Sequence, residues 1–190
     1  MKRFFDFTLA VVCLVVFSPL LLICAIAVGW DDGLPILYRQ ERIGLHGKPF
    51  WIYKFRSMRK DAELDGPTLL HISDDHHLTQ VGKFLRAHHL DELPQLWNVL
   101  KGDMSFVGPR PERKFFIDEI IKHDARYPLL YQIRPGVTSY ATLHNGYTDT
   151  MEKMLKRLQL DLDYLEHRSM GLDLKILLLT FLNIAFGKQF

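Results

Sequence analysis

The amino-acid sequence predicts a mainly α-helical protein with a small β-hairpin and a membrane element at its N-terminal end. Three observations lead to this fold class: 190 residues suffice for one domain, residues 9–28 are almost continuously apolar, and residues 36–58 alternate as two short strands do. We therefore expect a membrane segment over residues 1–32. A compact domain should follow over residues 33–190, with a second apolar helix at its end.

Charge and composition exclude several classes of protein. The chain has 24 Lys and Arg residues and 22 Asp and Glu residues, which gives a net charge of +2. A general nucleic-acid binder needs a surplus of cations to neutralise phosphates, so this balance argues against that class. A hydrophobic content of 48% excludes a disordered chain. Cys13 and Cys24 are too few for a disulfide scaffold or a cysteine-rich zinc site. Both lie in the apolar run, where cysteine behaves as a small hydrophobic residue.

The N-terminal apolar run, residues 9–28, is interrupted only by Ser18 and Pro19. A helix of that length reaches about 30 Å, the thickness of a hydrocarbon core. A cleaved signal peptide fits less well, because its apolar region is usually about 7–15 residues long and a small-residue cleavage site should follow. Pro19 lacks an amide hydrogen and clashes with the carbonyl of Val15, so we expect a kink there. The Ser18 hydroxyl can bond a carbonyl that the kink releases.

The residues leave the topology of this segment open between a full span and a re-entrant hairpin. Basic flanks favour the cytoplasmic side, and both flanks of the run are basic. Lys2 and Arg3 precede it, and the basic residues that follow are Arg39, Arg42, Lys48, Lys54, Arg56, Arg59 and Lys60. A hairpin keeps both flanks on one side, whereas a full span separates them.

The compact domain should begin with the β-hairpin, whose strands flank a loop marked by Gly44, Gly47 and Pro49. Residues 61–75 are polar and predict a loop. The acidic and histidine residues at 74–77 match no zinc-ligand spacing, so a solvated loop is favoured there over a metal site.

Two helices are expected next. The first covers residues 78–89, and the second has Asp91 near its N-cap, Pro94 in its first turn and Gly102 after its end. The residues expected on its apolar side are Leu96, Trp97 and Leu100.

The remainder of the domain alternates loops and helices. Residues 103–111 and 134–146 carry Gly and Pro and predict loops, and residues 112–123 predict a helix. A Met and Leu stripe over residues 151–165 predicts a helix that packs in the core, with no cofactor implied.

A second apolar stretch, residues 172–186, is too short to span a membrane. Its polar residues fall near one helical face, and these are Asp173, Thr180 and Asn183. An amphipathic helix at the membrane surface and an ordinary helix packed on the domain both fit this pattern.

Asp91 and Glu92 are the most informative pair of side chains. Capping alone can explain acids at the start of a helix, because the helix dipole favours them there. The same terminus also favours phosphate, and the cations that could meet it are Lys54, Arg56, Arg86 and Arg110. With a membrane element in the chain, these residues suit phosphoryl transfer to a lipid-borne substrate, aided by a divalent ion.

The sequence around this pair resembles the bacterial sugar transferases, which are monotopic phosphoglycosyl transferases. Residues 90–111 carry the most specific block, LDELPQLWNVLKGDMSFVGPRP. The other matching motifs are KRFFD at 2–6, the helix break at Ser18 and Pro19, YKFRSM at 53–58, RPGVT at 134–138 and LDLKI at 172–176.

The resemblance implies transfer of a sugar 1-phosphate from a UDP-sugar to polyprenyl (undecaprenyl) phosphate. UMP would leave, and the lipid-linked product would start a capsule, exopolysaccharide, O-antigen or glycoprotein glycan. Asp91 would be the nucleophile of a ping-pong mechanism with a phosphosugar-aspartyl intermediate, and also a ligand of Mg²⁺. Glu92 would assist, either as a base for the lipid phosphate or by helping to seat the metal.

The resemblance also implies roles for the surrounding residues. Lys54 or Arg56, with Arg86 and Arg110, would balance phosphate charge, and Asp173 would be a further carboxylate near the site. The first helix would be re-entrant, broken at Ser18 and Pro19, with both ends cytoplasmic. This places the catalytic domain at the cytoplasmic face of a bacterial inner membrane, among phospholipids; a homodimer is one open arrangement.

Two features depart from the family pattern. Residues 139–147 differ from the usual sequence, and Tyr147 replaces an arginine. The chain also lacks the extra spans of larger relatives, so we expect a minimal catalytic form. Two alternatives stay open: a membrane-anchored, non-catalytic lipid-binding or assembly protein, and a single-span hydrolase that uses water in place of the lipid.

Overall fold

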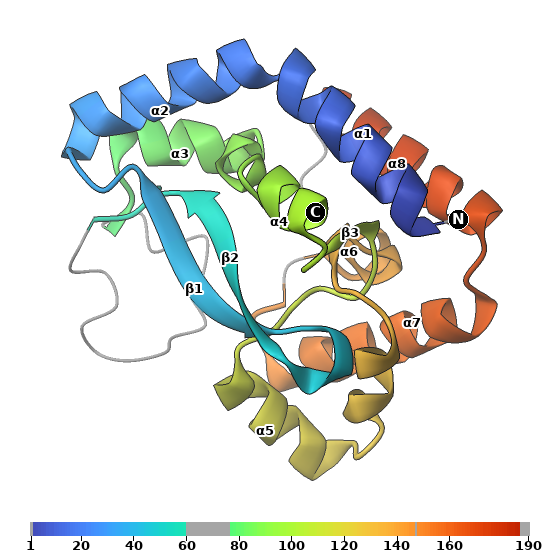
Figure 1. The fold of residues 1–190 in the computed structure, drawn as a ribbon. Helices are drawn as coiled ribbons and strands as arrows, with labels where there is room; N and C mark the ends of the chain where they lie inside the picture. The colour runs from blue at the N-terminus through green and yellow to red at the C-terminus, as the bar shows by residue number, and fades with distance from the viewer. Residues whose placement is uncertain (1, 60–76, 147, 187–190) are drawn as a thin grey trace.

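A computed structural model describes residues 2–59, 77–146 and 148–186, and it confirms a mainly helical protein with an antiparallel β-hairpin (Figure 1). The helices are α1 (Lys2–Val16), α2 (Ser18–Asp32), α3 (Gln80–Ala87), α4 (Gln95–Lys101), α5 (Lys114–His123), α6 (Tyr140–Asn145), α7 (Met151–His167) and α8 (Met170–Ala185). The strands are β1 (Leu37–Ile43), β2 (Pro49–Phe55), β3 (Ser105–Val107) and β4 (Gly136–Thr138). Short 3-10 turns are η1 (Leu45–Gly47), η3 (Leu90–Glu92) and η4 (Tyr127–Gln132).

The N-terminal apolar run forms two helices, α1 and α2, bent by 63° at their junction. The Ser18 hydroxyl donates to the carbonyl of Val15 at 2.8 Å, and Pro19 lies in the first turn of α2. The expected kink and its serine hydrogen bond are therefore confirmed. No described helix is by itself long and apolar enough to cross a membrane; the bent pair meets that requirement only together.

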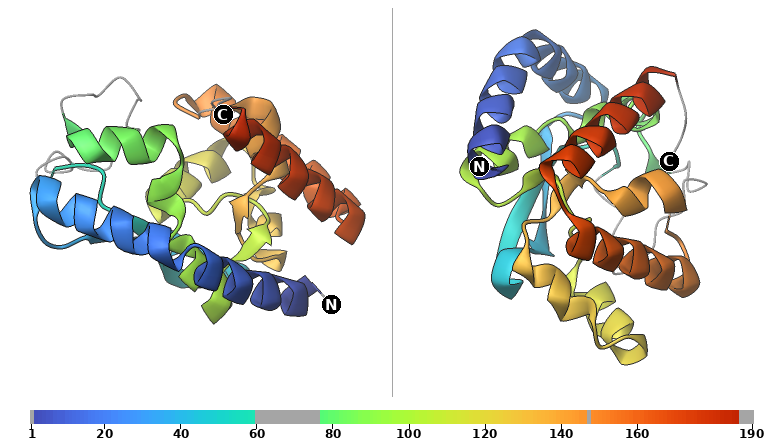
Figure 2. Two further views of the ribbon diagram at one scale, coloured as in Figure 1. Left: turned by 90° about the horizontal axis from the view of Figure 1, so that it is seen from above. Right: turned by 90° about the vertical axis from the view of Figure 1, so that its right-hand side faces the viewer.

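The bent pair lies along one side of the molecule as an arch. Beneath it, α4 packs against α1 and α3 packs against α2 (Figures 1 and 2). The start of α8 is joined to the start of α1, where Lys2 binds Asp173. Helix α8 buries Asp173 and Ile176 toward the domain and leaves Leu178 and Phe181 exposed. It is thus a helix packed on the domain that also carries an exposed apolar face.

The expected hairpin is confirmed, with β1 and β2 paired from Leu37 opposite Phe55 to Ile43 opposite Pro49. Its turn holds His46 and Gly47 at positive φ, which glycine adopts without strain. The hairpin carries the Lys54 side chain toward the turn η3, which its strand β2 contacts.

The Met and Leu stripe of α7 is confirmed as core. Met154, Leu158 and Leu162 are buried and pack against α5 and η4. A second cluster joins α1, α4, β3 and α8 through Ala10, Val99, Met104, Phe106 and Ile176.

The two expected loops over residues 103–111 and 134–146 were wrong in part, because each contains a strand. Strands β3 and β4 pair in parallel, and α6 follows β4. A Cβ at Gly108 would lie 2.3 Å from the carbonyl oxygen of Arg134, and one at Gly136 would lie 2.2 Å from the nitrogen of Gly108. Glycine at both positions lets the two segments approach this closely, and three-residue strands leave little periodic signal.

Helix boundaries differ from expectation where side chains hold the flanking backbone. Helix α3 begins at Gln80 because Thr79 caps it, accepting the N–H of Gly82 at 2.9 Å. Trp97 was expected on the apolar side of α4, but its side chain is 51% exposed. The buried side of that helix carries Leu96 and Val99 instead. The predicted loop at 61–75 and the histidines and acids at 74–76 lie outside the described residues, as does Tyr147.

Candidate active site

The Asp91 and Glu92 pair lies on the 3-10 turn η3, between α3 and α4. The turn begins after His89, whose backbone is left-handed at φ 55°, and α4 starts only at Gln95 with Pro94 as its N-cap. The expectation that Asp91 is near the N-cap of α4, with Pro94 in the first turn, was therefore wrong. The left-handed residue and the 3-10 turn redirect the chain before the helix starts.

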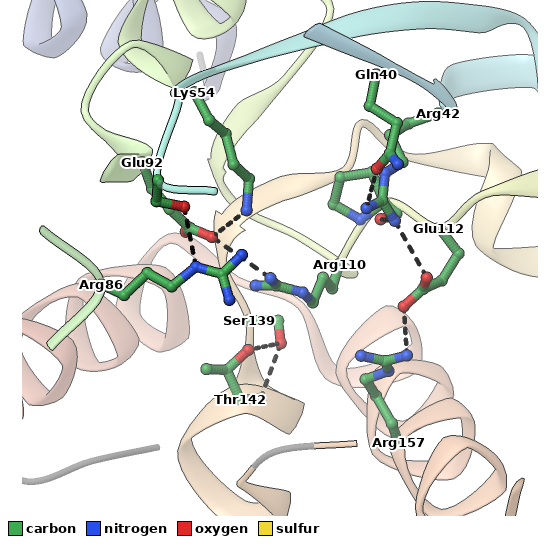
Figure 3. A network of polar contacts seen from close by, with 12 residues as sticks. Gln40, Arg42, Lys54, Arg86, Glu92, Arg110, Glu112, Ser139, Thr142 and Arg157 are labelled. Atoms are coloured by element: carbon green, nitrogen blue, oxygen red, sulfur yellow. Dashed lines mark hydrogen bonds and ion pairs between the residues drawn. The ribbon is translucent and has the colours of Figure 1, made fainter. Parts of the chain in front are cut away.

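Glu92 is held by two cations. Its Oε1 accepts a hydrogen bond from Lys54 Nζ at 2.6 Å and from Arg110 Nη2 at 3.4 Å (Figure 3). Burial alone would raise the pKa of Glu92, but the charges of Lys54 and Arg110 outweigh it and hold that pKa well below its usual range. Glu92 is thus ionised and already engaged, which makes it a weak candidate for a base.

Asp91 has a different environment, although it directly precedes Glu92 in the chain. Its side chain is buried, and within the described chain it makes no hydrogen bond or ion pair. Burial raises the pKa of Asp91, the neighbouring charge of Glu92 raises it further, and Lys54 and Arg86 act against both. The two adjacent carboxylates therefore have opposite shifts in pKa, which is typical of paired groups with separate chemical roles.

Arg86 approaches the pair from α3, as predicted. Its Nε donates to the Ser57 hydroxyl at 3.0 Å (Figure 3). The start of α3 is fixed to the same residue, because the N–H of Thr79 donates to the carbonyl of Ser57 at 3.1 Å. A Cβ at Gly82 would lie 2.0 Å from that carbonyl oxygen, so only glycine permits this contact.

Arg110 approaches from the opposite side, on the loop after β3. Its backbone is tied to β4, since the N–H of Gly136 donates to the carbonyl of Pro109 at 2.9 Å. Together, Lys54, Arg86 and Arg110 surround the turn that carries Asp91 and Glu92 (Figure 3).

The contacts of Arg56 and Asp173 lie elsewhere. Arg56 Nη2 donates to the carbonyls of Asp32 at 2.6 Å and Gly33 at 2.8 Å, and it lies 3.0 Å from the Asp32 carboxylate. It therefore anchors the end of α2, although its neighbour Lys54 reaches Glu92. Lys54 and Arg56 are two residues apart and would share one face of a continuous strand. Strand β2 ends at Phe55, so Arg56 lies beyond it and its side chain turns to the end of α2.

Asp173 binds the N-terminal helix. Its carboxylate accepts hydrogen bonds from Lys2 Nζ at 2.5 Å and from the Tyr164 hydroxyl at 2.6 Å. It borders a hollow of about 460 Å³ between the start of α1 and the start of α8. The lining residues of this hollow do not include Asp91 or Glu92.

Comparison with known proteins identifies the family. A family model described as bacterial sugar transferase matches residues 1–187. The chain belongs to the bacterial sugar transferase family.

Curated relatives share the sequence of this chain over nearly its whole length. It is 42% identical over 181 residues to the UDP-glucose:undecaprenyl-phosphate glucose-1-phosphate transferase of Klebsiella pneumoniae, covering 94% of this chain and 39% of that protein. It is 43% identical to the protein of the same name from Caulobacter vibrioides, covering 94% of this chain and 67% of the relative. It is 36% identical to the UDP-N-acetylgalactosamine-undecaprenyl-phosphate N-acetylgalactosaminephosphotransferase of Aeromonas hydrophila. That match covers 98% of this chain and 44% of the relative. The chain spans 39% of the Klebsiella relative, so the shared region is one part of that longer protein.

Sequence reasoning missed a second buried charge cluster in this chain. Glu112 forms ion pairs with Arg157 and with Arg42, the latter at 3.2 Å (Figure 3). The buried Asp161 borders the same small cavity as Glu112 and Arg157. The available signal was an arginine and an aspartate, Arg157 and Asp161, one helical turn apart on the face of α7 that also carries Leu158. Charged residues that share a buried helix face need partners there.

A metal site in this chain has a limited set of donors. Among residues 2–59, 77–146 and 148–186, no group of three His, Cys, Asp or Glu side chains lies close enough to hold a metal by itself. Mg²⁺ needs less, because phosphoryl-transfer sites often hold it with one or two carboxylates and the substrate phosphates. The carboxylate of Asp91 is not engaged by a described residue, so it fits such a site, whereas Glu92 is engaged by Lys54 and Arg110.

Proposed function

We propose that this chain transfers a sugar 1-phosphate from a UDP-sugar to undecaprenyl phosphate, releasing UMP. The observation that carries the proposal is the unequal pair: Glu92 is neutralised by Lys54 and Arg110, while Asp91 is buried, unengaged in the described chain and next to cations. The names of the relatives describe this reaction for glucose 1-phosphate and for N-acetylgalactosamine phosphate. The product would be the first lipid-linked intermediate of a surface glycan.

In the first step, an Asp91 carboxylate oxygen attacks the β-phosphorus of the UDP-sugar. A bond forms between that oxygen and the phosphorus, and the bond from the phosphorus to the bridging oxygen breaks, so UMP leaves with the electron pair. Arg86 and Arg110 are the cations that would stabilise the charge which develops on the phosphoryl oxygens. Asp91 must be ionised for this step, and Lys54 and Arg86 favour that form.

In the second step, a phosphate oxygen of the lipid attacks the phosphorus of the phosphosugar-aspartyl group. The new diphosphate bond forms as the bond to Asp91 breaks, which regenerates the carboxylate. The low pKa of Glu92 favours an electrostatic role for this residue, in which it holds Lys54 and Arg110 beside the reacting phosphate. We therefore assign it positioning of cations in preference to proton transfer.

Mg²⁺ belongs to the proposal as the cofactor. Asp91 would hold it, and when bound it supplies positive charge that lets an anionic diphosphate approach a carboxylate. Without that charge, the ionised Asp91 carboxylate would repel the substrate phosphates.

We further propose that the α1–α2 pair is re-entrant and that the catalytic domain lies at the cytoplasmic face of the inner membrane. The 63° bend, the basic residues Lys2 and Arg3 in the first turn of α1, and the apolar residues exposed along both helices support this arrangement. Their exposed residues include Val12, Val15, Leu22, Ile23 and Ile26. The proposed geometry brings the site to the surface where a soluble nucleotide sugar meets a lipid phosphate.

UMP release tests the proposed reaction against its alternatives. The purified chain is incubated with Mg²⁺ and UDP-glucose or UDP-N-acetylgalactosamine, with and without undecaprenyl phosphate. Multiple-turnover release that requires the lipid supports the transferase. Equal release without the lipid indicates a hydrolase, and no release with any donor indicates a non-catalytic lipid-binding or assembly protein.

A further inference from the structure

The start of α1 presents one face to the domain. Arg3, Asp6 and Ala10 recur at intervals of three and four residues, so they share one side of the helix. Asp6 is 2% exposed, and its Oδ1 accepts the backbone N–H of Phe106 at 3.2 Å. Ala10 is fully buried in the hydrophobic cluster that contains Val99. These contacts fix α1 on the domain, and Arg3 lies in the first turn of the same face.

The Arg3 guanidinium binds the last turn of α4, which lies against α1 (Figure 1). Its Nη1 donates to the carbonyl of Val99 at 2.5 Å, and its Nη2 donates to the carbonyl of Leu100 at 2.7 Å. The last carbonyls of a helix lie beyond its regular hydrogen-bond ladder, and a cation there also suits the negative end of the helix dipole. One planar guanidinium thus holds two successive carbonyls at the end of α4.

Gly102 makes room for this contact. It follows the last residue of α4 with a backbone φ of 95°, and a Cβ at this position would lie 3.1 Å from Arg3 Nη2. Glycine suits both the left-handed backbone and the close approach of the guanidinium. The carbonyl of Gly102 accepts the Nε of Arg134 at 2.8 Å. The end of α4 therefore receives cations from two distant segments.

Helix α4 connects the Arg3 contact to the reacting side chains. The turn η3, which carries Asp91 and Glu92, continues into α4, where the N–H of Leu96 donates to the carbonyl of Leu93 at 3.1 Å. Helix α4 has seven residues and is therefore about 10 Å long. Because the helix is this short, its far end has a direct effect on where the turn lies.

The same helix also holds strand β2. Asn98 of α4 is fully buried, and its side-chain amide bonds two backbone groups of the strand. The Oδ1 accepts the N–H of Tyr53 at 3.1 Å, and the Nδ2 donates to the carbonyl of Trp51 at 2.7 Å. Lys54, which binds Glu92, is the next residue of that strand. The placement of α4 thus affects both partners of the Lys54–Glu92 ion pair.

Arg3 also belongs to the basic flank of the apolar run, and that role needs only a positive charge. The contact with α4 needs more, because two carbonyls are held at once by the fork of a guanidinium. A lysine has the same charge on a compact ammonium and lacks the fork. Replacement of Arg3 by lysine therefore separates the two roles.

We propose that Arg3 is a positioning residue of the active site: by holding the end of α4, it fixes the turn from which Asp91 attacks. The inference rests on the proposed function, because that function makes Asp91 the reacting carboxylate. Arg3 does not touch the substrate; it acts through α4.

Single-turnover UMP release without lipid tests the proposal, with Arg3→Lys and Arg3→Gln in nanodiscs. Each time course gives an amplitude, which counts the active chains, and a rate constant for the attack by Asp91. Both variants should lower the rate constant by about 10- to 100-fold, because displacement of a reacting group by about 1 Å has an effect of that size. The UDP-sugar concentration for half-maximal rate should change by less than about threefold, since Arg86 and Arg110 lie on other elements.

The matched control is Arg39→Lys, the same chemical change at an exposed arginine that lies 5.2 Å from the centre of the Trp51 ring. It should leave the amplitude and the rate constant unchanged. A wild-type rate constant in Arg3→Lys would overturn the proposal, because positive charge alone would then explain Arg3. A lower amplitude at an unchanged rate constant would also overturn it, since a purely structural role removes folded chains without slowing those that remain.

Gly102→Ala tests the contact from the other side. The added Cβ would meet Arg3 Nη2, so the rate constant should fall when Arg3 is present. In the Arg3→Lys background the same change should have less than about a twofold effect, because the two substitutions remove one contact. Equal decreases in the two backgrounds would overturn the proposal, since backbone strain at residue 102 acts whatever the side chain at residue 3.

Amide hydrogen exchange provides a measurement that does not depend on activity. Residues 90–101 should exchange faster in Arg3→Lys than in the unmodified chain, and at the unmodified rate in Arg39→Lys. Unchanged exchange of residues 90–101 in Arg3→Lys would overturn the proposal. Faster exchange in a chain that forms no product with any UDP-sugar keeps the link between Arg3 and α4 and rejects the proposed function instead.

Discussion

The Lys54 ammonium lies 2.6 Å from the Glu92 carboxylate and joins strand β2 to the turn that carries Asp91. The bond uses the charge of Glu92, while Asp91, one residue earlier, makes no such contact in the described chain. The two neighbouring carboxylates on this 3-10 turn thus have different surroundings. Glu92 is paired with Lys54 and Arg110, whereas Asp91 remains available to bind a ligand.

We predict that Glu92→Gln lowers the pKa of Asp91. Burial and then the charge of Glu92 raise that pKa, so removing the charge should lower it, and Lys54 would remain to favour the ionised form. Because only ionised Asp91 attacks, activity is lost as pH falls through its pKa, and the acid limb of UMP release in a single turnover should move to lower pH. Glu119→Gln, which removes an exposed carboxylate paired with Lys122, should leave the limb in place. A limb that moves upward in Glu92→Gln contradicts the assignment.

We predict that Gly82→Ala destabilises the protein by about 1–3 kcal/mol, the usual cost of overpacking a fixed contact. The added Cβ would lie 2.0 Å from the carbonyl oxygen of Ser57, so α3 must shift and carry Arg86 with it. Thermal unfolding in detergent measures the effect. Gly171→Ala is the matched control, because its Cβ would meet only the Ser169 hydroxyl, at 4.0 Å. Equal melting temperatures for the two variants would disprove the contact.

We predict that Pro19→Ala reduces the 63° bend between α1 and α2. Alanine restores an N–H that can donate to the carbonyl of Val15, which now accepts the Ser18 hydroxyl. Spin labels at Phe7 and Trp30, in a chain whose cysteines are replaced by alanine, should move apart in nanodiscs. Leu22→Ala, a change at an exposed residue of α2, should not alter the distance. An unchanged distance in Pro19→Ala would assign the bend to other contacts.

We predict that Asp161→Asn stabilises the fold more at high pH than at low pH. The folded pKa of Asp161 is about 7, above its ordinary value of 3.8, so the wild type loses stability as pH rises between these values. Asparagine does not titrate, so the free energy of unfolding of the variant does not fall with pH in this way. One pKa unit corresponds to about 1.4 kcal/mol, so the excess stability of Asp161→Asn over the wild type should grow up to pH 7 and reach several times that value. Urea unfolding in detergent from pH 4.5 to 8 measures it, with Asp163→Asn as the control. An advantage independent of pH would mean that Asp161 does not titrate in this range.

The sequence was sufficient for the elements whose signal is local and periodic. Gly44, Gly47 and Pro49 located the hairpin turn, the Met and Leu stripe located α7, and Pro19 located the bend. The gathering of Lys54, Arg86 and Arg110 around Asp91 and Glu92 was also predicted, because a helix start that favours phosphate led us to expect cations there. Arg56 was expected with them, but it contacts the end of α2.

Contacts between distant segments could not be predicted in this way. The parallel pair β3–β4 depends on glycines at 108 and 136 that meet only in the folded chain. Arg56 precedes α3 in sequence but anchors the end of α2, and Trp97 is exposed because packing on α1 selects another face of α4. Asp161 lies on a face of α7 where most residues are apolar. The apolar pattern therefore indicated a core helix and gave no sign of the buried charge cluster.

The central claim is that Asp91 becomes covalently attached to the sugar phosphate. The direct measurement is intact-protein mass spectrometry after incubation with a UDP-sugar and Mg²⁺ in the absence of lipid, followed by peptide mapping. We predict a mass increase of one sugar phosphate on Asp91, lost on addition of undecaprenyl phosphate and absent from Asp91→Asn, while Asp118→Asn forms it normally. Product formation by Asp91→Asn would contradict the account. So would a wild-type enzyme that turns over rapidly with lipid but never carries a sugar phosphate on Asp91.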